Sequence, residues 1–198
     1  MRGPLGRTLS RGRFANHKET FLAKRDKSGK GEWDASILRT CSLLNALPWC
    51  FSTSSCGGRA YFWTGTDVPG KRKTEPRMER LRETHVPPDG EFFALPEAPA
   101  ALWLRFEPFI LHVRVATWAD GQRLARAARP AAPNTHVMVG AQKLTVTIPG
   151  VDSLELPYRW NGRPASIPDD DLLSILQTKF VRNSKRIEDL EKSLAQLS

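Results

Sequence analysis

Cysteine is scarce in this sequence, and the three that occur, Cys41, Cys50 and Cys56, form no CxxC pair. An odd number of cysteines without that spacing predicts neither a disulfide framework nor a zinc site, so we expect a reducing compartment and no bound metal. Long apolar runs are also missing. No stretch reaches the roughly 18 residues of a membrane span, and none follows the N-terminus as a secretory signal requires. These absences predict a soluble protein.

What remains is the composition of an ordinary folded chain. Apolar residues make up 40% and charged residues 26% of the 198 residues, a balance that is typical of globular proteins. This length favours one domain with room for an ordinary core. The 15 prolines and 14 glycines indicate many turns, which argues against a long helical bundle.

Positive charge is concentrated at the start of the chain. The formal net charge is +9, and residues 1–30 hold nine Lys/Arg against Glu19 and Asp26, a net of +7. We expect residues 1–13 to form a basic, flexible arm ahead of a domain over 14–198, with nucleic acid as the partner of the arm. The same composition fits an organellar transit peptide, so a mitochondrial location is the alternative to a cytoplasmic one. The residues expected to contact nucleic acid are Arg2, Arg7, Arg11, Arg13 and Lys30.

The hydrophobic pattern predicts an α+β fold. We expect one compact domain in which helices flank a mixed sheet and a long helix closes the chain. Apolar periodicity and stop signals predict helices over 14–23, 33–47 and 119–129, and from 168 to the end. Between 64 and 88 we expect a loop and a short basic helix. Strands are predicted over 49–52, 60–63, 102–115, 135–139, 144–148 and 154–158.

A polar stretch, 51–59, stands out between two short apolar runs. It reads Phe-Ser-Thr-Ser-Ser-Cys-Gly-Gly-Arg and combines four hydroxyls, a thiol, two glycines and a cation. If the flanking runs are strands, the stretch is a loop between them, where backbone N–H groups, hydroxyls and an arginine fork can bind one anion. A plain polar turn is the alternative.

Residues 102–115 carry the clearest strand pattern, and Pro108 within them predicts a bulge or an edge. Alternation places His112 on the face of Ile110 and Arg114, opposite Leu111 and Val113. His112 is therefore either a core histidine or one that faces a ligand. A Cys56–His112 nucleophilic pair would make the chain a thiol hydrolase, but the sequence places no third group beside them.

Separate blocks of the sequence resemble the tRNA wybutosine-synthesizing protein 3 family. The family block F-E-P-F-I/V-L-H-V occurs whole at 106–113, and its T-S-S-C-x-G-R block occurs at 53–59. A Thr-His pair matches Thr84 and His85. Together the matching blocks cover roughly residues 14–190 in the right order. The remaining matches are D-x-S-x-K-G-x-x-D at Asp26, Ser28, Lys30, Gly31 and Asp34, and N-x-x-R-I at Asn183, Arg186 and Ile187.

The resemblance implies a methyltransferase that uses S-adenosyl-L-methionine and acts on tRNA. Its substrate would be the tricyclic, aminocarboxypropyl-bearing guanosine beside the anticodon of tRNA-Phe, methylated on a ring nitrogen during wybutosine formation. The family does not have the Rossmann fold, and this chain accordingly lacks a G-x-G-x-x-G after a strand. The resemblance, with the residue chemistry, assigns catalysis to His112 and His85, and cofactor or substrate binding to Ser54, Ser55, Cys56, Gly58, Arg59, Glu107 and Asn134.

One departure from the family pattern affects the site. Where the family usually has G-F-R-N-S-G, this chain reads Ala-Pro-Asn-Thr-His-Val over 132–137, without the arginine or the glycines. Asn134 or His136 can only partly replace an arginine fork that binds a carboxylate. A paralogue with altered specificity, or a tRNA-binding homologue without catalysis, is therefore the alternative.

Overall fold

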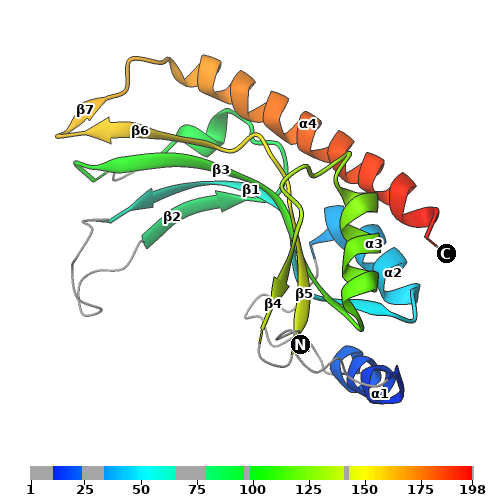
Figure 1. The fold of residues 1–198 in the computed structure, drawn as a ribbon. Helices are drawn as coiled ribbons and strands as arrows, with labels where there is room; N and C mark the ends of the chain where they lie inside the picture. The colour runs from blue at the N-terminus through cyan, green and yellow to red at the C-terminus, as the bar shows by residue number, and fades with distance from the viewer. Residues whose placement is uncertain (1–10, 24–33, 66–78, 96–98, 141–142, 198) are drawn as a thin grey trace, which may run out of the picture. The chain divides into compact units, whose positions relative to one another are not determined.

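The computed structural model describes residues 11–23, 34–65, 79–95, 99–140 and 143–197 (Figure 1). Four α-helices, two short 3-10 helices and seven strands lie in these ranges. In chain order they are α1 (Arg11–Leu22), η1 (Ala35–Ile37), α2 (Leu38–Ala46), β1 (Cys50–Thr64), β2 (Glu79–Thr84), η2 (Gly90–Phe93), β3 (Leu102–Val115), α3 (Trp118–Ala128), β4 (His136–Val139), β5 (Leu144–Pro149), β6 (Leu154–Trp160), β7 (Arg163–Pro164) and α4 (Asp169–Ala195).

The strands form one sheet in the order β2-β1-β3-β5-β4, and β6 pairs with β3 and with β7. The α+β class and the long C-terminal helix are confirmed. Each pairing whose register is described is antiparallel, so the sheet is not mixed in these pairings as the sequence had predicted. No helix of the described residues is both long and apolar enough to span a membrane.

Two local predictions were wrong. Residues 51–59 do not form a loop, because they lie inside the continuous strand β1, and residues 79–84 form the strand β2 instead of a basic helix. In both cases pairing with neighbouring strands outweighs the local preference, since a serine-rich or arginine-rich segment extends when its backbone groups bond across a sheet. Gly58 keeps the positive φ, +108°, that a glycine permits.

Strand β3 changes partner along its length. Its first residues, Leu102–Phe106, pair with β6, and its last, Ile110–Val115, pair with β5. Pro108 lies between these two registers, as expected for a residue that cannot donate a ladder hydrogen bond. Strand β3 stays continuous through this proline, so the predicted bulge or edge takes the form of a change of pairing partner.

The chain divides into two compact units, each with its own core. Unit 1 contains the described residues of 1–57, 109–151 and 184–198, and unit 2 contains 58–108 and 152–183. The expected boundary between a basic arm and a domain stays a prediction, because residues 1–10 lie outside the described residues. Helix α1 already begins at Arg11, so the last three residues of the expected arm are helical.

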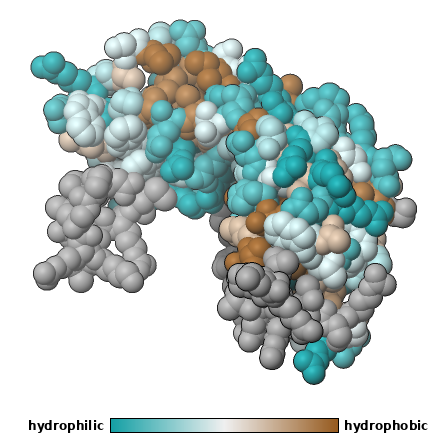
Figure 2. All heavy atoms as spheres, viewed as in Figure 1, coloured by the Kyte–Doolittle hydropathy of each residue, from teal (hydrophilic) through white to brown (hydrophobic). Residues whose placement is uncertain are grey.

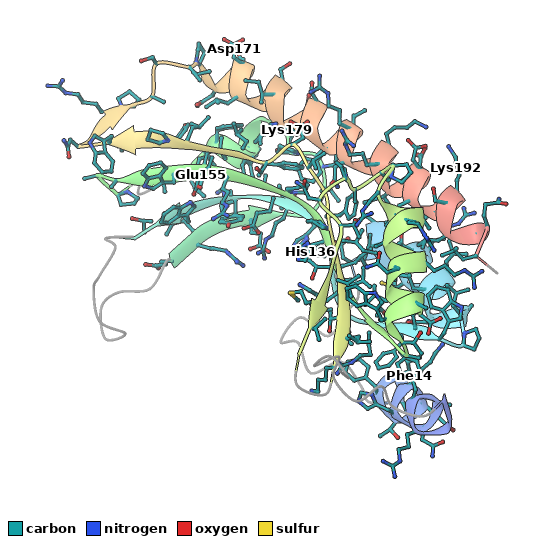
Figure 3. The ribbon with its side chains drawn as sticks, in the orientation of Figure 1. Phe14, His136, Glu155, Asp171, Lys179 and Lys192 are labelled. Atoms are coloured by element: carbon teal, nitrogen blue, oxygen red, sulfur yellow. The ribbon has the colours of Figure 1, made fainter. Side chains whose placement is uncertain are left out.

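The core of unit 1 lies between its part of the sheet and helices α2, α3 and α4. Alternate residues of β3 and β5, such as Val113 and Val146, contribute to it, together with Leu124 of α3 and Leu190 of α4. A capping box begins α3: the hydroxyl of Thr117 accepts the N–H of Asp120. On the other face of the sheet, Phe14 of α1 packs against Phe51 with ring centroids 5.5 Å apart; Phe14 is labelled in Figure 3.

The core of unit 2 is mainly aromatic. Phe62 of β1 packs against Phe92 of η2 and Tyr158 of β6, with ring centroids 5.1 and 4.8 Å apart. Helix α4 closes this core through Phe180, and Lys179 of the same helix donates to Asp152 at 2.7 Å. Partly buried leucines border the core, and Figure 2 shows apolar side chains gathered near the start of α4. These leucines are Leu154, Leu156, Leu95 and Leu173.

Candidate functional site

The candidate site of unit 2 is built on the face of β1 and β3 that points away from its core. Ala60 and Phe62 enter the core, so their neighbours Arg59 and Tyr61 lie on the opposite face. Phe106 likewise enters the core, and Glu107 after it lies on the face of Arg59. The alternation of β-strands therefore brings the arginine of the polar stretch together with the glutamate of the F-E-P-F block.

Glu107 is held by three side chains. Arg59 donates from Nε and Nη2 to the oxygen Oε2 of Glu107, at 2.9 and 2.7 Å. The hydroxyl of Tyr61 donates to the other oxygen, Oε1, at 2.9 Å. Arg105 approaches Oε1 to 3.3 Å. Each carboxylate oxygen of Glu107 is therefore occupied by at least one donor, and its orientation is fixed.

These contacts shift the pKa of Glu107 and of Tyr61 in opposite directions. Burial alone would raise the pKa of the Glu107 carboxyl, but hydrogen bonds from Arg59 and Tyr61 and the charges of Arg59 and Arg105 outweigh it and lower the pKa. The pKa of Tyr61 is raised, first by burial and then by its bond to the carboxylate. At neutral pH the pair is a carboxylate and a phenol.

Strand β2 adds a second carboxylate and a histidine. The register places Glu83 opposite Tyr61, and Oε1 of Glu83 lies 2.8 Å from Nε2 of His85. Arg80 donates to Oε2 of Glu83 at 2.9 Å, and its guanidinium lies 4.8 Å from the ring centre of Tyr61. Because Nη1 of Arg59 lies 3.7 Å from Glu83, one network joins the two carboxylates.

We call these five residues, Arg59, Tyr61, Glu83, His85 and Glu107, the arginine–glutamate network. Sequence reasoning named Arg59, Glu107 and His85, and the structure brings them together. It missed Tyr61 and Glu83. The signal for Tyr61 was its position two residues after Arg59 in a strand, but the polar stretch had been interpreted as a loop.

The rest of the polar stretch has mainly internal roles in the structure. Ser54 is exposed, and Ser55 and Cys56 are half-buried. The thiol of Cys41 is buried, which raises its pKa, and a hydrogen bond with Ser55 opposes that shift. The N–H of Gly57 donates to Asp34 at 2.8 Å, where Asp34 also caps η1.

Gly58 lies where other chain segments approach closely. A Cβ atom at this position would lie 2.9 Å from Nδ2 of Asn183 and 3.2 Å from the carbonyl oxygen of Glu107. Both contacts are closer than side-chain carbons normally allow. Close packing within unit 2 therefore explains the glycine at position 58, whereas the sequence had suggested a ligand-binding loop.

His112 lies in unit 1, on the face of the sheet opposite the core. It is half-buried, and the hydroxyl of Thr53 donates to its carbonyl oxygen at 3.0 Å. Thr147 of β5 is its cross-strand partner, and His136 of β4, labelled in Figure 3, pairs with Thr147 in turn. His112 is therefore not a core histidine. Asn134 is exposed, and its carbonyl oxygen lies 2.9 Å from Nδ1 of His136.

The residues expected to contact nucleic acid are only partly described. Arg13 is exposed in α1, and Arg11 is the first residue of that helix. Arg2, Arg7 and Lys30 lie outside the described residues. Their role in binding nucleic acid stays a prediction.

Comparison with known proteins identifies one family. The family model described as Methyltransferase TYW3 matches residues 16–196. The tRNA wybutosine-synthesizing protein 3 homolog of Mus musculus is 33% identical over 180 residues, 88% of this chain and 70% of that protein. The tRNA(Phe) 7-((3-amino-3-carboxypropyl)-4-demethylwyosine(37)-N(4))-methyltransferase of Thermococcus sibiricus is 26% identical over 155 residues, 73% of this chain and 74% of that protein.

Solved structures show the same fold. The PH1069 protein from Pyrococcus horikoshii superposes with a TM-score of 0.81 at 20% identity, over 95% of this chain and 97% of that chain. A hypothetical protein from Aeropyrum pernix superposes with a TM-score of 0.67 at 22% identity, over 82% and 96%. Because the family model covers most of both units, including the arginine–glutamate network, the chain belongs to the TYW3 methyltransferase family.

Proposed function

We propose that this chain transfers a methyl group from S-adenosyl-L-methionine to a ring nitrogen of the aminocarboxypropyl-bearing tricyclic guanosine in tRNA-Phe, during wybutosine biosynthesis. The match of the family model over 16–196 carries this proposal. The name of the Thermococcus sibiricus relative, which describes this reaction for that protein, supports the choice of substrate.

The reaction makes few chemical demands. A nitrogen–carbon bond forms as the carbon–sulfur bond of the sulfonium breaks, so the donor leaves as the neutral thioether S-adenosylhomocysteine. S-adenosyl-L-methionine supplies the electrophilic methyl group when bound. The protein must align the nitrogen lone pair with that methyl, exclude water and accept any proton that the nitrogen carries. Positioning therefore matters more than acid–base strength.

The carboxylates of the arginine–glutamate network fit such a cofactor, because Oε1 of Glu107 accepts one described hydrogen bond, from Tyr61, and a carboxylate oxygen can accept two. S-adenosyl-L-methionine carries a sulfonium and an ammonium group, and both cations favour neighbouring carboxylates. Glu107 stays ionised, since Arg59 and Tyr61 hold its pKa low, and its orientation is fixed by bonds of 2.7 to 2.9 Å. We therefore assign Glu107 to binding and Arg59 to orienting it. Ser54 and Ser55 of β1, which belong to unit 1, stay proposed as hydroxyl contacts to the cofactor or the substrate.

His85 is the proposed proton acceptor of this network. Its Nε2 lies 2.8 Å from Glu83, so a carboxylate orients the ring and favours the tautomer with the proton on Nε2. In that tautomer Nδ1 is the basic nitrogen. His112, half-buried on the sheet face of unit 1, is the second candidate for proton acceptance or for contact with a base edge.

The test is methyl transfer to a defined tRNA. The purified chain is incubated with S-adenosyl-L-[methyl-³H]methionine and with tRNA-Phe carrying the aminocarboxypropyl intermediate, and the product nucleosides are separated. Mature tRNA-Phe, already methylated, is the matched control. We expect label in the tricyclic nucleoside of the first tRNA and none in the second.

Other results would overturn the proposal in distinct ways. Binding of tRNA without binding of S-adenosyl-L-methionine in calorimetry would establish the alternative, a tRNA-binding homologue without catalysis. Label in a different nucleoside would establish a paralogue with altered specificity.

A further inference from the structure

A buried arginine lies on β3 of unit 1. Arg114 is only 8% exposed, and its Nε has no hydrogen-bond partner within the described part of the chain. Two positions away on the neighbouring strand, the hydroxyl of Thr147 is in the same condition at 7% exposure. Buried polar groups are almost always paired, so two such side chains together need an explanation.

The strand register places both groups on one face. Arg114 pairs with Thr145, and His112 pairs with Thr147, so Arg114 and Thr147 are diagonal neighbours on β3 and β5. Val113 and Val146, which alternate with them, enter the core of unit 1 on the other face. We call Arg114, Thr147 and His112 the arginine–threonine row.

The row continues to the edge of the sheet and becomes more exposed along the way. His136 of β4 pairs with Thr147 and is exposed, and Met138, which pairs with Thr145, is 45% exposed. Among the described side chains, exposure therefore increases from Arg114 toward β4, which is the side from which a small group would approach the guanidinium.

A buried guanidinium whose Nε has no described partner is costly in such a place. Desolvation of an ion in a protein costs several kcal/mol, which a well-placed anion with hydrogen bonds can offset. Burial also lowers the pKa of Arg114, yet arginine stays protonated at neutral pH. A carboxylate matches this site, because the arginine fork binds its two oxygens and the threonine hydroxyl can donate a further bond.

We propose that the arginine–threonine row binds the carboxylate of an α-amino acid group. This inference rests on the proposed function, because both the methyl donor and the aminocarboxypropyl side chain of the substrate end in such a group. A phosphate within the tRNA backbone fits less well. It is part of a continuous polymer, whereas a side chain that is 8% exposed is reached more readily by a terminal group.

Three variants separate the possible sources of the carboxylate. Arg114→Met removes the charge at similar volume, Thr147→Val removes the hydroxyl alone, and Arg126→Met changes an exposed arginine of α3 as the control. Calorimetry compares S-adenosyl-L-methionine with decarboxylated S-adenosylmethionine, which lacks only the carboxylate. Kinetics compare tRNA-Phe carrying the aminocarboxypropyl group with tRNA-Phe carrying demethylwyosine without it.

If the donor carboxylate binds the row, Arg114→Met lowers affinity for S-adenosyl-L-methionine about tenfold or more and leaves affinity for the decarboxylated form unchanged. If the substrate carboxylate binds it, donor affinity is unchanged, and kcat/KM falls by a similar factor only for tRNA with the aminocarboxypropyl group. Thr147→Val lowers the same affinity or kcat/KM by a smaller factor. Arg126→Met affects neither.

The thermal midpoint gives a readout that does not depend on the reaction. Without ligand, Arg114→Met should be at least as stable as the wild type, since it removes a buried charged group whose Nε has no described partner. A strongly lowered Tm would mean that Arg114 has a partner within the chain, and the proposal would fail. It would also fail if Arg114→Met changed neither the binding of the two methyl donors nor the kinetics with the two tRNA substrates. Equal weakening of all four ligands would overturn it as well.

Failure of the proposed function would look different. If the wild-type chain binds no S-adenosyl-L-methionine and methylates no tRNA, both proposed ligands are excluded, but the buried arginine still needs an explanation. Sodium acetate then serves as the probe, against sodium chloride at equal ionic strength. The proposed site requires acetate to raise the Tm of the wild type and not that of Arg114→Met, and equal shifts would overturn it.

Discussion

Arg59 and Glu107 meet through a single oxygen: Nε and Nη2 of the arginine both donate to Oε2 of the glutamate, at 2.9 and 2.7 Å. The other oxygen of Glu107 accepts from Tyr61. This arrangement gives Arg59 a different role from the anion binding that the sequence suggested. Arg59 already has a carboxylate partner in its own unit, so its first role is to fix Glu107 in place.

We expect Arg59→Ala to lower both stability and affinity for S-adenosyl-L-methionine. The variant leaves Glu107 without its strongest donors, and because both side chains are partly exposed, we expect a loss of about 1 to 2 kcal/mol in the free energy of unfolding. Methyl transfer should fall sharply. Urea unfolding, calorimetry and the tRNA assay measure these effects, with Arg126→Ala as an exposed control; unchanged turnover would remove the network from the site.

The depressed pKa of Glu107 predicts how stability depends on pH. A carboxyl whose pKa is lower in the folded state contributes stability above its unfolded value of about 4.3, and loses it as pH falls through the folded value. The difference in Tm between wild type and Glu107→Gln should therefore be largest near neutral pH and shrink below about pH 4. Glu188→Gln, at an exposed position of α4, is the control. A constant difference across this range would contradict the shift.

Variants of two adjacent residues of β3 can distinguish a catalytic role from a packing role. His112 is half-buried outside the core, whereas the side chain of Val113 is fully buried within it. We expect His112→Ala to cost less than about 1 kcal/mol of stability but most of the methyl transfer. Val113→Ala should cost about 2 kcal/mol or more and keep the specific activity of its folded fraction. The reverse pattern would make His112 a structural residue.

The sequence predicted those elements whose signals are local. Alternation through Leu102–Val115 identified β3, and three aspartates before a leucine stripe identified α4. Strands β1 and β2 were misread because their extension depends on pairing with each other, and Ala60↔Thr84 is a contact between residues 24 positions apart. Local composition contains no information on such pairing.

The same reason explains the partial prediction of the site. Arg59, Glu107 and His85 belong to blocks that are recognisable in the sequence, but only the structure shows that they lie close together. Glu83 joins the network through the register of β2 against β1, which the sequence does not give. Arg114 needed the structure as well, because the sequence showed its face but neither its burial nor the absence of a described partner for its Nε.

Alanine substitutions at two glycines with positive φ can separate the cost of close packing from the cost of backbone strain. Gly58 has a φ of +108° and a close neighbour in Asn183, while Gly162 has a φ of +75° and no described atom within 4 Å of a built Cβ. We expect Gly162→Ala to cost about 1 kcal/mol and Gly58→Ala clearly more, because Asn183 must also move. Equal losses in urea unfolding would mean that the close contact relaxes without cost.

The last prediction concerns the basic start of the chain. Deleting residues 1–13 removes four arginines and no acid, so we expect weaker tRNA binding and a log-affinity against log-salt slope that is flatter by about one to three units. Helix α1 begins at Arg11, and Phe14 in its first turn is 2% exposed, so this deletion also disturbs packing. Deleting residues 1–10 avoids that, and should flatten the slope by about one to two units because it removes Arg2 and Arg7.

A full-length Arg2→Gln/Arg7→Gln variant isolates charge from length and should reproduce the shorter deletion. Filter binding at several salt concentrations measures the slope, and calorimetry should show unchanged affinity for S-adenosyl-L-methionine. Because phosphate contacts carry no sequence information, discrimination between tRNA-Phe and other tRNAs should survive at low salt. A slope that is the same in all variants would mean that these arginines do not meet phosphate. The interpretation of the same residues as an organellar transit peptide would then be favoured, since that role needs positive charge but no contact with tRNA.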